Sequence, residues 1–136
     1  MNYNILAPPL IALLAWIFIL IWFSKKKKQE KMKRQQLLTQ IKEQLPISSF
    51  KELLQTLENL NYNPSWCYFK TSTFEGGNVA LDNTCFLQRE NQWVVCLADW
   101  HSFSDEQSFD SEQEACEYFV YKYFHLSKEE INWLKQ

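Results

Sequence analysis

Cysteine is the residue type in this chain most capable of metal binding or redox chemistry, and its spacing argues against both. Successive cysteines lie 18, 11 and 20 residues apart, so the chain has no C-x-x-C pair of the kind that zinc sites use. Each cysteine lies in an apolar stretch, where a free thiol packs as a small hydrophobic side chain. We therefore expect buried, reduced thiols and no metal at Cys67, Cys85, Cys96 and Cys116.

Asp99 and His101 lie close to Cys96 in the sequence, a combination of residue types that nucleophilic catalysis uses. In an extended strand Asp99 and His101 would share one face and Cys96 would lie on the other, so the three would not meet. The chain also lacks a P-loop, a Gly-rich dinucleotide motif and a zinc-protease motif. We expect a protein that is not an enzyme and needs no cofactor. A hydrolase that uses Asp99 and His101 is the alternative.

A run of acidic and aromatic residues dominates the C-terminal half. Between Glu90 and Tyr121 there are eight acids and no Lys or Arg, with Trp, Phe and Tyr interleaved. Acidic charge speeds association with a cationic partner and repels nucleic acid, while aromatic side chains anchor interfaces. The alternative is that the acids only keep the domain soluble. The candidate residues for binding a protein partner are Asp99, Trp100, His101, Phe103, Asp105, Glu106 and Asp110.

Charge is strongly segregated along the 136 residues. Residues 25–34 hold seven basic residues and one acid, a balance of +6, whereas residues 35–136 hold seven basic residues and fifteen acids, a balance of -8. Residues 1–24 carry no charged side chain. The length fits one small domain with attachments, and a content of only two glycines with 16% aromatic residues argues against a disordered chain.

The N-terminal segment has the length of a single membrane span. Nineteen consecutive uncharged residues run from Ile5 to Phe23. As a helix they would match the thickness of the hydrocarbon core. A secretory signal peptide would carry positive charge before this stretch, whereas here the lysines follow it. By the positive-inside rule, the N-terminus faces outside and the domain is cytoplasmic. The lysines that flank the span at the anionic headgroups are Lys25, Lys26, Lys27 and Lys28.

Helical periodicity and capping residues predict four helical stretches after the span. Residues 25–44 form a continuous helical stretch with a short apolar stripe, which is a stalk, a first helix of the domain or a coiled-coil segment that supports a weak homodimer. Ser-x-x-Glu patterns open three further helices, at about 50–60, 112–125 and 128–134.

Aromatic and β-branched residues predict three strands, at 66–73, 79–89 and 93–100, joined by short turns. The second is either one strand or a strand interrupted around Asp82-Asn83. We therefore predict an α+β fold in which helices cover a three-stranded antiparallel sheet. The expected organisation is a transmembrane anchor (1–24), a basic collar with a helical linker (25–45) and an acidic cytoplasmic domain (46–136).

The segment from Phe86 to Phe124 resembles the small immunity proteins of bacterial polymorphic-toxin and contact-dependent growth inhibition systems. Those families pair a strand–turn–strand carrying Arg-Glu and Trp with a loop and a helix that begins Phe-x-(Ser/Thr)-Glu-x-x-Ala-Cys. The helix pattern is occupied here by Phe109, Ser111, Glu112, Ala115 and Cys116. The resemblance implies an inhibitor that neutralises a cognate toxin by tight binding. A basic toxin, as nuclease toxins usually are, would match the acidic domain.

Together, the resemblance and the apolar segment predict a membrane-tethered immunity protein in the bacterial inner membrane that occludes a basic toxin. The alternative is a single-pass adaptor or assembly protein of the bacterial envelope, which would dock to another envelope protein.

Overall fold

The computed structural model describes residues 7–136. The chain divides into two compact units, with the boundary between Thr39 and Gln40. Helix α1 (Ala7–Gln44) begins with two prolines in its first turn, where a missing N–H does little harm. Its apolar part exposes large side chains such as Trp16 and Phe18, and among the described residues α1 is the one helix long and apolar enough to cross a membrane. The expected apolar helix is confirmed as a candidate span, and residues 5 and 6 lie outside the described part.

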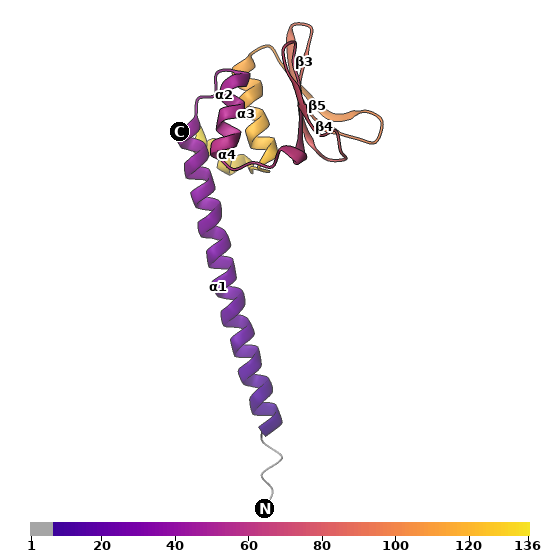
Figure 1. The fold of residues 1–136 in the computed structure, drawn as a ribbon. Coiled ribbons are helices and arrows are strands. Elements are labelled where there is room, and N and C mark those ends of the chain that lie inside the picture. Colours follow the sequence, from indigo (N-terminus) through magenta and orange to yellow (C-terminus); the bar gives the residue numbers. More distant parts are fainter. Residues whose placement is uncertain (1–6) are drawn as a thin grey trace, which may run out of the picture. The chain divides into compact units, whose positions relative to one another are not determined.

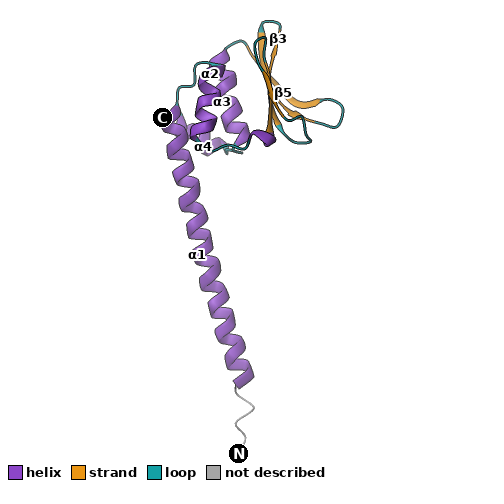
Figure 2. Cartoon of the chain, viewed as in Figure 1, coloured by secondary structure: helices purple, strands orange, loops and turns teal. Residues whose placement is uncertain are grey.

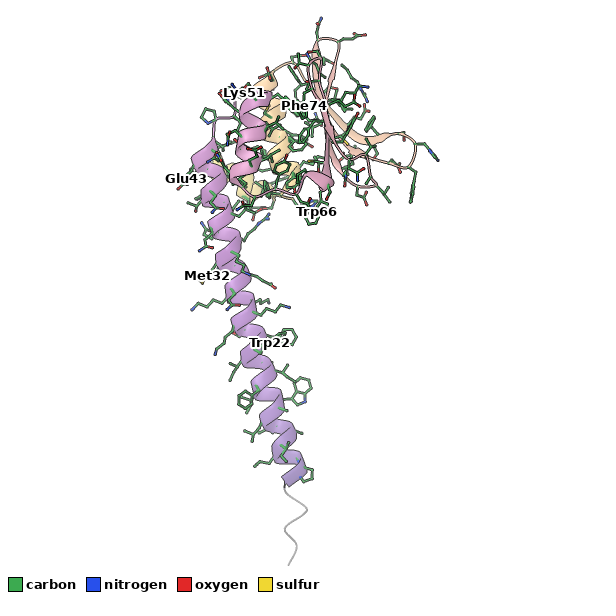
Figure 3. The ribbon with its side chains drawn as sticks, in the orientation of Figure 1. Trp22, Met32, Glu43, Lys51, Trp66 and Phe74 are labelled. Atoms are coloured by element: carbon green, nitrogen blue, oxygen red, sulfur yellow. The ribbon has the colours of Figure 1, made fainter. Side chains whose placement is uncertain are left out.

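The lysines after the apolar part lie on the same continuous helix. The Lys26 ammonium lies 5.2 Å from the centre of the Trp22 ring, one helical turn away, which is a cation–π contact. Trp22 and Met32 project from α1 on either side of the lysine run (Figure 3). This pairing places an aromatic ring and a cation together at the end of the apolar stretch, as at a membrane–water interface.

The second unit is an α+β domain whose helices lie on one side of a sheet (Figures 1 and 2). Its helices after α1 are α2 (Phe50–Asn59), α3 (Glu112–Tyr123) and α4 (Lys128–Leu134). The hydroxyls of Ser49, Ser111 and Ser127 each accept an N–H from the first turn, and α4 has the complete capping box. All three Ser-x-x-Glu predictions of helix starts are confirmed.

The sheet has five strands and is mixed, so the prediction of three antiparallel strands is wrong. The strands are β1 (Cys67–Lys70), β2 (Glu75–Gly77), β3 (Thr84–Arg89), β4 (Gln92–Ala98) and β5 (Phe103–Phe109), and η1 (Pro64–Trp66) is a short 3-10 turn before β1. Their order in the sheet is β2-β1-β3-β4-β5. Strands β1 and β3 pair in parallel, and the other neighbours pair antiparallel.

Glycine makes the unpredicted strand β2 possible. Gly77 has φ +86°, and a Cβ at this position would lie 2.2 Å from the Cys67 carbonyl oxygen. Only glycine permits that approach, which brings β2 against β1 and leaves the other edge of β1 for β3. The β2 hairpin therefore turns the expected antiparallel meander into a mixed sheet.

The core has two parts, one on each face of the sheet. On the helix side, the ring centre of Phe119 in α3 lies 5.3 Å from that of Phe69 and 6.1 Å from that of Phe86. Phe50 of α2 stacks on Phe86 at 5.3 Å. On the opposite face, Tyr68 and Phe103 pack over a smaller buried cluster, which consists of Cys85, Leu87, Val94, Cys96 and Ala98.

Two long-range contacts hold helices to one another within this unit. The Glu112 carboxylate at the start of α3 accepts the Phe50 N–H at the start of α2, at 2.7 Å. The Lys42 ammonium lies 4.2 Å from the centre of the Trp133 ring and donates to the Trp133 carbonyl at 3.3 Å. That carbonyl lies in the last turn of α4, where a cation is favourable.

Candidate partner-binding site

The β4–β5 connection holds three of the predicted partner-binding residues in one exposed turn. The Asp99 N–H donates to the Ser102 carbonyl at 2.8 Å, and the Asp99 carboxylate accepts the Trp100 N–H at 2.8 Å. Trp100 is 77% exposed, although a large aromatic side chain normally finds cover. Asp99 and His101 are exposed on either side of it. The turn therefore presents an apolar anchor beside a carboxylate.

Phe103 is placed differently, at the start of β5. It is half-buried and packs on the smaller core cluster. The Arg89 guanidinium lies 5.7 Å from the centre of its ring. Phe103 therefore contributes more to the packing of the sheet than to an exposed binding surface.

Asp105 and Glu106 point to opposite faces of the sheet. The register of β4 and β5 shifts between Val95 and Leu97, and Asp105 has φ +51°, as in a β-bulge. Asp105 accepts from Lys122 of α3, on the helix side. Glu106 pairs with Arg89 of β3 at 2.9 Å, on the other side.

Two of the predicted acids are thus partly neutralised within the domain, and a third has a polar partner. The Asp110 carboxylate accepts from the Gln92 amide at 3.2 Å. The structure brings Asp99, Trp100 and His101 together, whereas Asp105, Glu106 and Asp110 are distributed along β5 and its end.

Comparison with known proteins adds no relative. No family model, no curated protein and no solved structure matches this chain. The chemistry of the exposed residues is therefore the basis for a functional proposal.

Several exposed apolar residues at the same end of the sheet as Trp100 were missing from the sequence prediction. Trp66, Val79 and Leu81 are 62%, 52% and 46% exposed. Trp66 and Leu81 line one open depression, together with Asp82, Tyr123 and His125. In sequence, Trp66 and Val79 fell within predicted strands, where an aromatic or β-branched residue is expected to be covered.

The surroundings of the four thiols shift their pKa values in both directions: the pKa of Cys96 is lowered by its hydrogen bond with Cys85, and the other three are raised. Burial raises the pKa of Cys67 to about 12, and burial also raises the pKa of Cys116. The hydrogen bond with Cys96, together with burial, raises the pKa of Cys85. All four cysteines are buried and free. Among residues 7–136, no three His, Cys, Asp or Glu side chains gather as metal ligands would.

Asp99 and His101 do not form a strand-borne pair, because β4 ends at Ala98 and both lie in the following turn. The Asp99 carboxylate is oriented by the Trp100 N–H, so it stabilises the turn. The site presents an exposed ring and a nearby negative charge on a hydrogen-bonded turn.

Proposed function

We propose that this chain is a membrane-tethered immunity protein whose acidic domain binds a cognate basic toxin and blocks it by occlusion. The observation that carries the proposal is Trp100, which is 77% exposed beside Asp99 on a domain with seven basic residues against fifteen acids. An exposed tryptophan beside a carboxylate is typical of an interface anchor and unusual on a surface that only faces solvent. The resemblance of residues 86–124 to bacterial immunity proteins points the same way.

The proposed mechanism is inhibition by binding, without turnover. The net charge of -8 over residues 35–136 would attract a cationic protein and raise its association rate. Burial of the Trp100 ring would slow dissociation. A toxin held in this way loses access to its substrate while the complex lasts.

The proposed location is the bacterial inner membrane, with the N-terminus outside and the domain in the cytoplasm. The apolar part of α1 is the span, and Lys25–Lys28 lie at the cytoplasmic headgroups. A C-terminal fusion to green fluorescent protein should fluoresce, and a C-terminal fusion to alkaline phosphatase should be inactive. The opposite pair of results would contradict this orientation.

A membrane-anchored adaptor of the envelope is the second candidate. It is favoured by the pairing of Asp105 with Lys122 and of Glu106 with Arg89, which reduces the open charge of β5. An adaptor would dock to integral membrane proteins and would tolerate the loss of surface acids.

Co-purification distinguishes the two proposals. The tagged full-length chain is isolated in mild detergent from its own cells, and its partners are identified by mass spectrometry. One stoichiometric basic protein, whose toxicity the chain suppresses when both are expressed, is the result expected of an immunity protein. Recovery of integral envelope proteins alone would support the adaptor.

A further inference from the structure

Four exposed apolar side chains belong to segments at the same end of the sheet. Because β1 and β3 run parallel and β4 runs antiparallel to them, the starts of β1 and β3 meet the end of β4. Trp66 directly precedes β1, and Trp100 follows β4 by two residues. Val79 and Leu81 lie in the connection from β2 to β3. Figure 3 shows Trp66 at this end of the domain and Phe74 nearer the other.

A buried asparagine joins the segments that carry three of these side chains, Trp66, Val79 and Leu81. Asn83 is 7% exposed, and its amide donates to the carbonyls of Ser65 at 2.9 Å and Asn78 at 2.7 Å. The Ala98 N–H donates to the Asn83 carbonyl at 2.9 Å, and the Asp82 N–H donates to the Ala98 carbonyl at 2.9 Å. The segments before β1 and before β3 are therefore held together, and backbone hydrogen bonds join them to Ala98, the last residue of β4.

The segments before β1 and β3 differ from ordinary exposed loops, because buried hydrogen bonds hold them in place. Loops fixed by buried hydrogen bonds lose little conformational entropy on binding, so their exposed side chains are prepared for contact. Four apolar side chains exposed at one end of the sheet, two of them lining one depression, are more than the single scattered residues of an ordinary surface. We call the exposed residues at this end of the sheet the Asn83 surface. They are Trp66, Val79, Leu81, Asp82, Asp99 and Trp100.

The charge of the Asn83 surface selects the kind of partner. Asp82 and Asp99 are its charged residues, and segments 61–69, 78–83 and 97–102 contain no Lys or Arg. Anionic lipid headgroups would be repelled by these carboxylates, whereas a cationic protein surface would be attracted. Tryptophan and leucine side chains need an apolar recess to enter, which a folded partner supplies.

We propose that the Asn83 surface is the docking site of the domain, and that its partner is a protein surface with an apolar recess and a cationic rim. The inference rests on the proposed function, because it names the surface on which the basic toxin would be held. It also moves the centre of binding from the acids of β5 to the end of the sheet. Trp66 and Trp100 are then the two principal anchors.

Photo-crosslinking in the cells of origin tests this assignment. The crosslinking amino acid p-benzoylphenylalanine replaces Trp66, Leu81 or Trp100 in the tagged full-length chain. Matched control positions are Gln107 on β5 and Lys51 on α2, which are exposed and lie outside the Asn83 surface. We expect adducts with one and the same cationic protein from all three surface positions, and none from the controls.

A second measurement separates binding from proximity. Trp66→Ala and Trp100→Ala should each weaken the affinity for that purified cationic protein at least tenfold, with unfolding midpoints unchanged because both side chains are exposed. Adducts from Gln107 alone would overturn the Asn83 surface and leave the immunity proposal standing. Lipid adducts from the surface positions would overturn it in favour of the bilayer. The absence of any cationic protein at all positions would overturn both proposals.

Discussion

The Lys122 ammonium of α3 forms an ion pair with the Asp105 carboxylate of β5, and so joins the helix layer to the edge of the sheet. The Lys122 side chain is 13% exposed and that of Asp105 is 66% exposed, so the cation is the more buried partner. Asp105 reaches it from a backbone with φ +51°, which the short side chains of Asp and Asn tolerate best. An acid that the sequence suggested for partner binding therefore acts first as a structural contact.

Asp105→Asn should destabilise the domain by about 1 kcal/mol, because it leaves the Lys122 charge without its counterion while keeping the backbone conformation. The matched change Asp99→Asn should cost less than about 0.5 kcal/mol, since it lies in an exposed turn. Urea unfolding of the full-length chain in detergent micelles measures both. In a Lys122→Met background the effect of Asp105→Asn should vanish. An undiminished effect there would show that the ion pair is not its cause.

Gly77→Ala should be strongly destabilising, by about 2–4 kcal/mol, because it combines a positive φ with a collision against backbone. The new Cβ would lie 2.2 Å from the Cys67 carbonyl oxygen. Gly76→Ala is the control, since its Cβ meets the Phe74 ring at 2.9 Å and an exposed side chain can move aside. Equal unfolding midpoints for the two variants would contradict the close approach of β2 to β1.

The helices could be predicted from sequence because their signals are local. Ser111 and Ser127 cap the helices that follow them within three residues, whatever the rest of the chain does. Strand β5 could not be predicted in this way, since the residues between Phe103 and Phe109 are polar and exposed. Its extended state depends on pairing with β4, which is a long-range effect.

The only part of the candidate site that could be predicted from sequence is the part that lies within one turn, at Asp99, Trp100 and His101. Trp100 was predicted as a binding residue at the end of the strand 93–100, and the structure ends β4 at Ala98 and places Trp100 in the exposed turn that follows. Trp66 and Leu81 are brought together by the hydrogen bonds of Asn83, and nothing in the spacing of those residues indicates them. Asp82, with φ +63°, interrupts the extended stretch 79–89 at the point where the sequence suggested a break, so that β3 begins only at Thr84.

The domain should lose stability in alkali, beginning near the ordinary thiol pKa. Burial raises the pKa of Cys67 from 9.0 to about 12 and that of Tyr121 from 10.0 to about 12. Between pH 9 and 12 the unfolded chain releases these protons and the folded chain keeps them, so unfolding becomes more favourable as pH rises. Below pH 9 these groups contribute no slope. Tyr121→Phe should flatten the fall of the urea midpoint between pH 10 and 12. An unchanged slope would contradict a shifted Tyr121.

Thiol reactivity should report global unfolding, because all four cysteines are buried. With Ellman's reagent at pH 8, the native full-length chain should release thionitrobenzoate only slowly, and all thiols should react at once in concentrated urea. Rapid reaction of a native thiol would show that its cover opens locally. The same assay compares Gly76→Ala with Gly77→Ala, and the Gly77 variant should react faster.

Asn83→Ala should loosen the end of the sheet more than it lowers global stability. The change removes two donors, leaves the Ser65 and Asn78 carbonyls without them, and should cost about 1–3 kcal/mol. Because these hydrogen bonds join the segments before β1 and β3, amide exchange should quicken first there, while α3 keeps its protection. Asn59→Ala is the matched control, since that amide is exposed and donates to Gln44 at 2.9 Å. If Asn83→Ala leaves exchange around Trp66 and Val79 unchanged, these segments are held by packing rather than by the asparagine side chain.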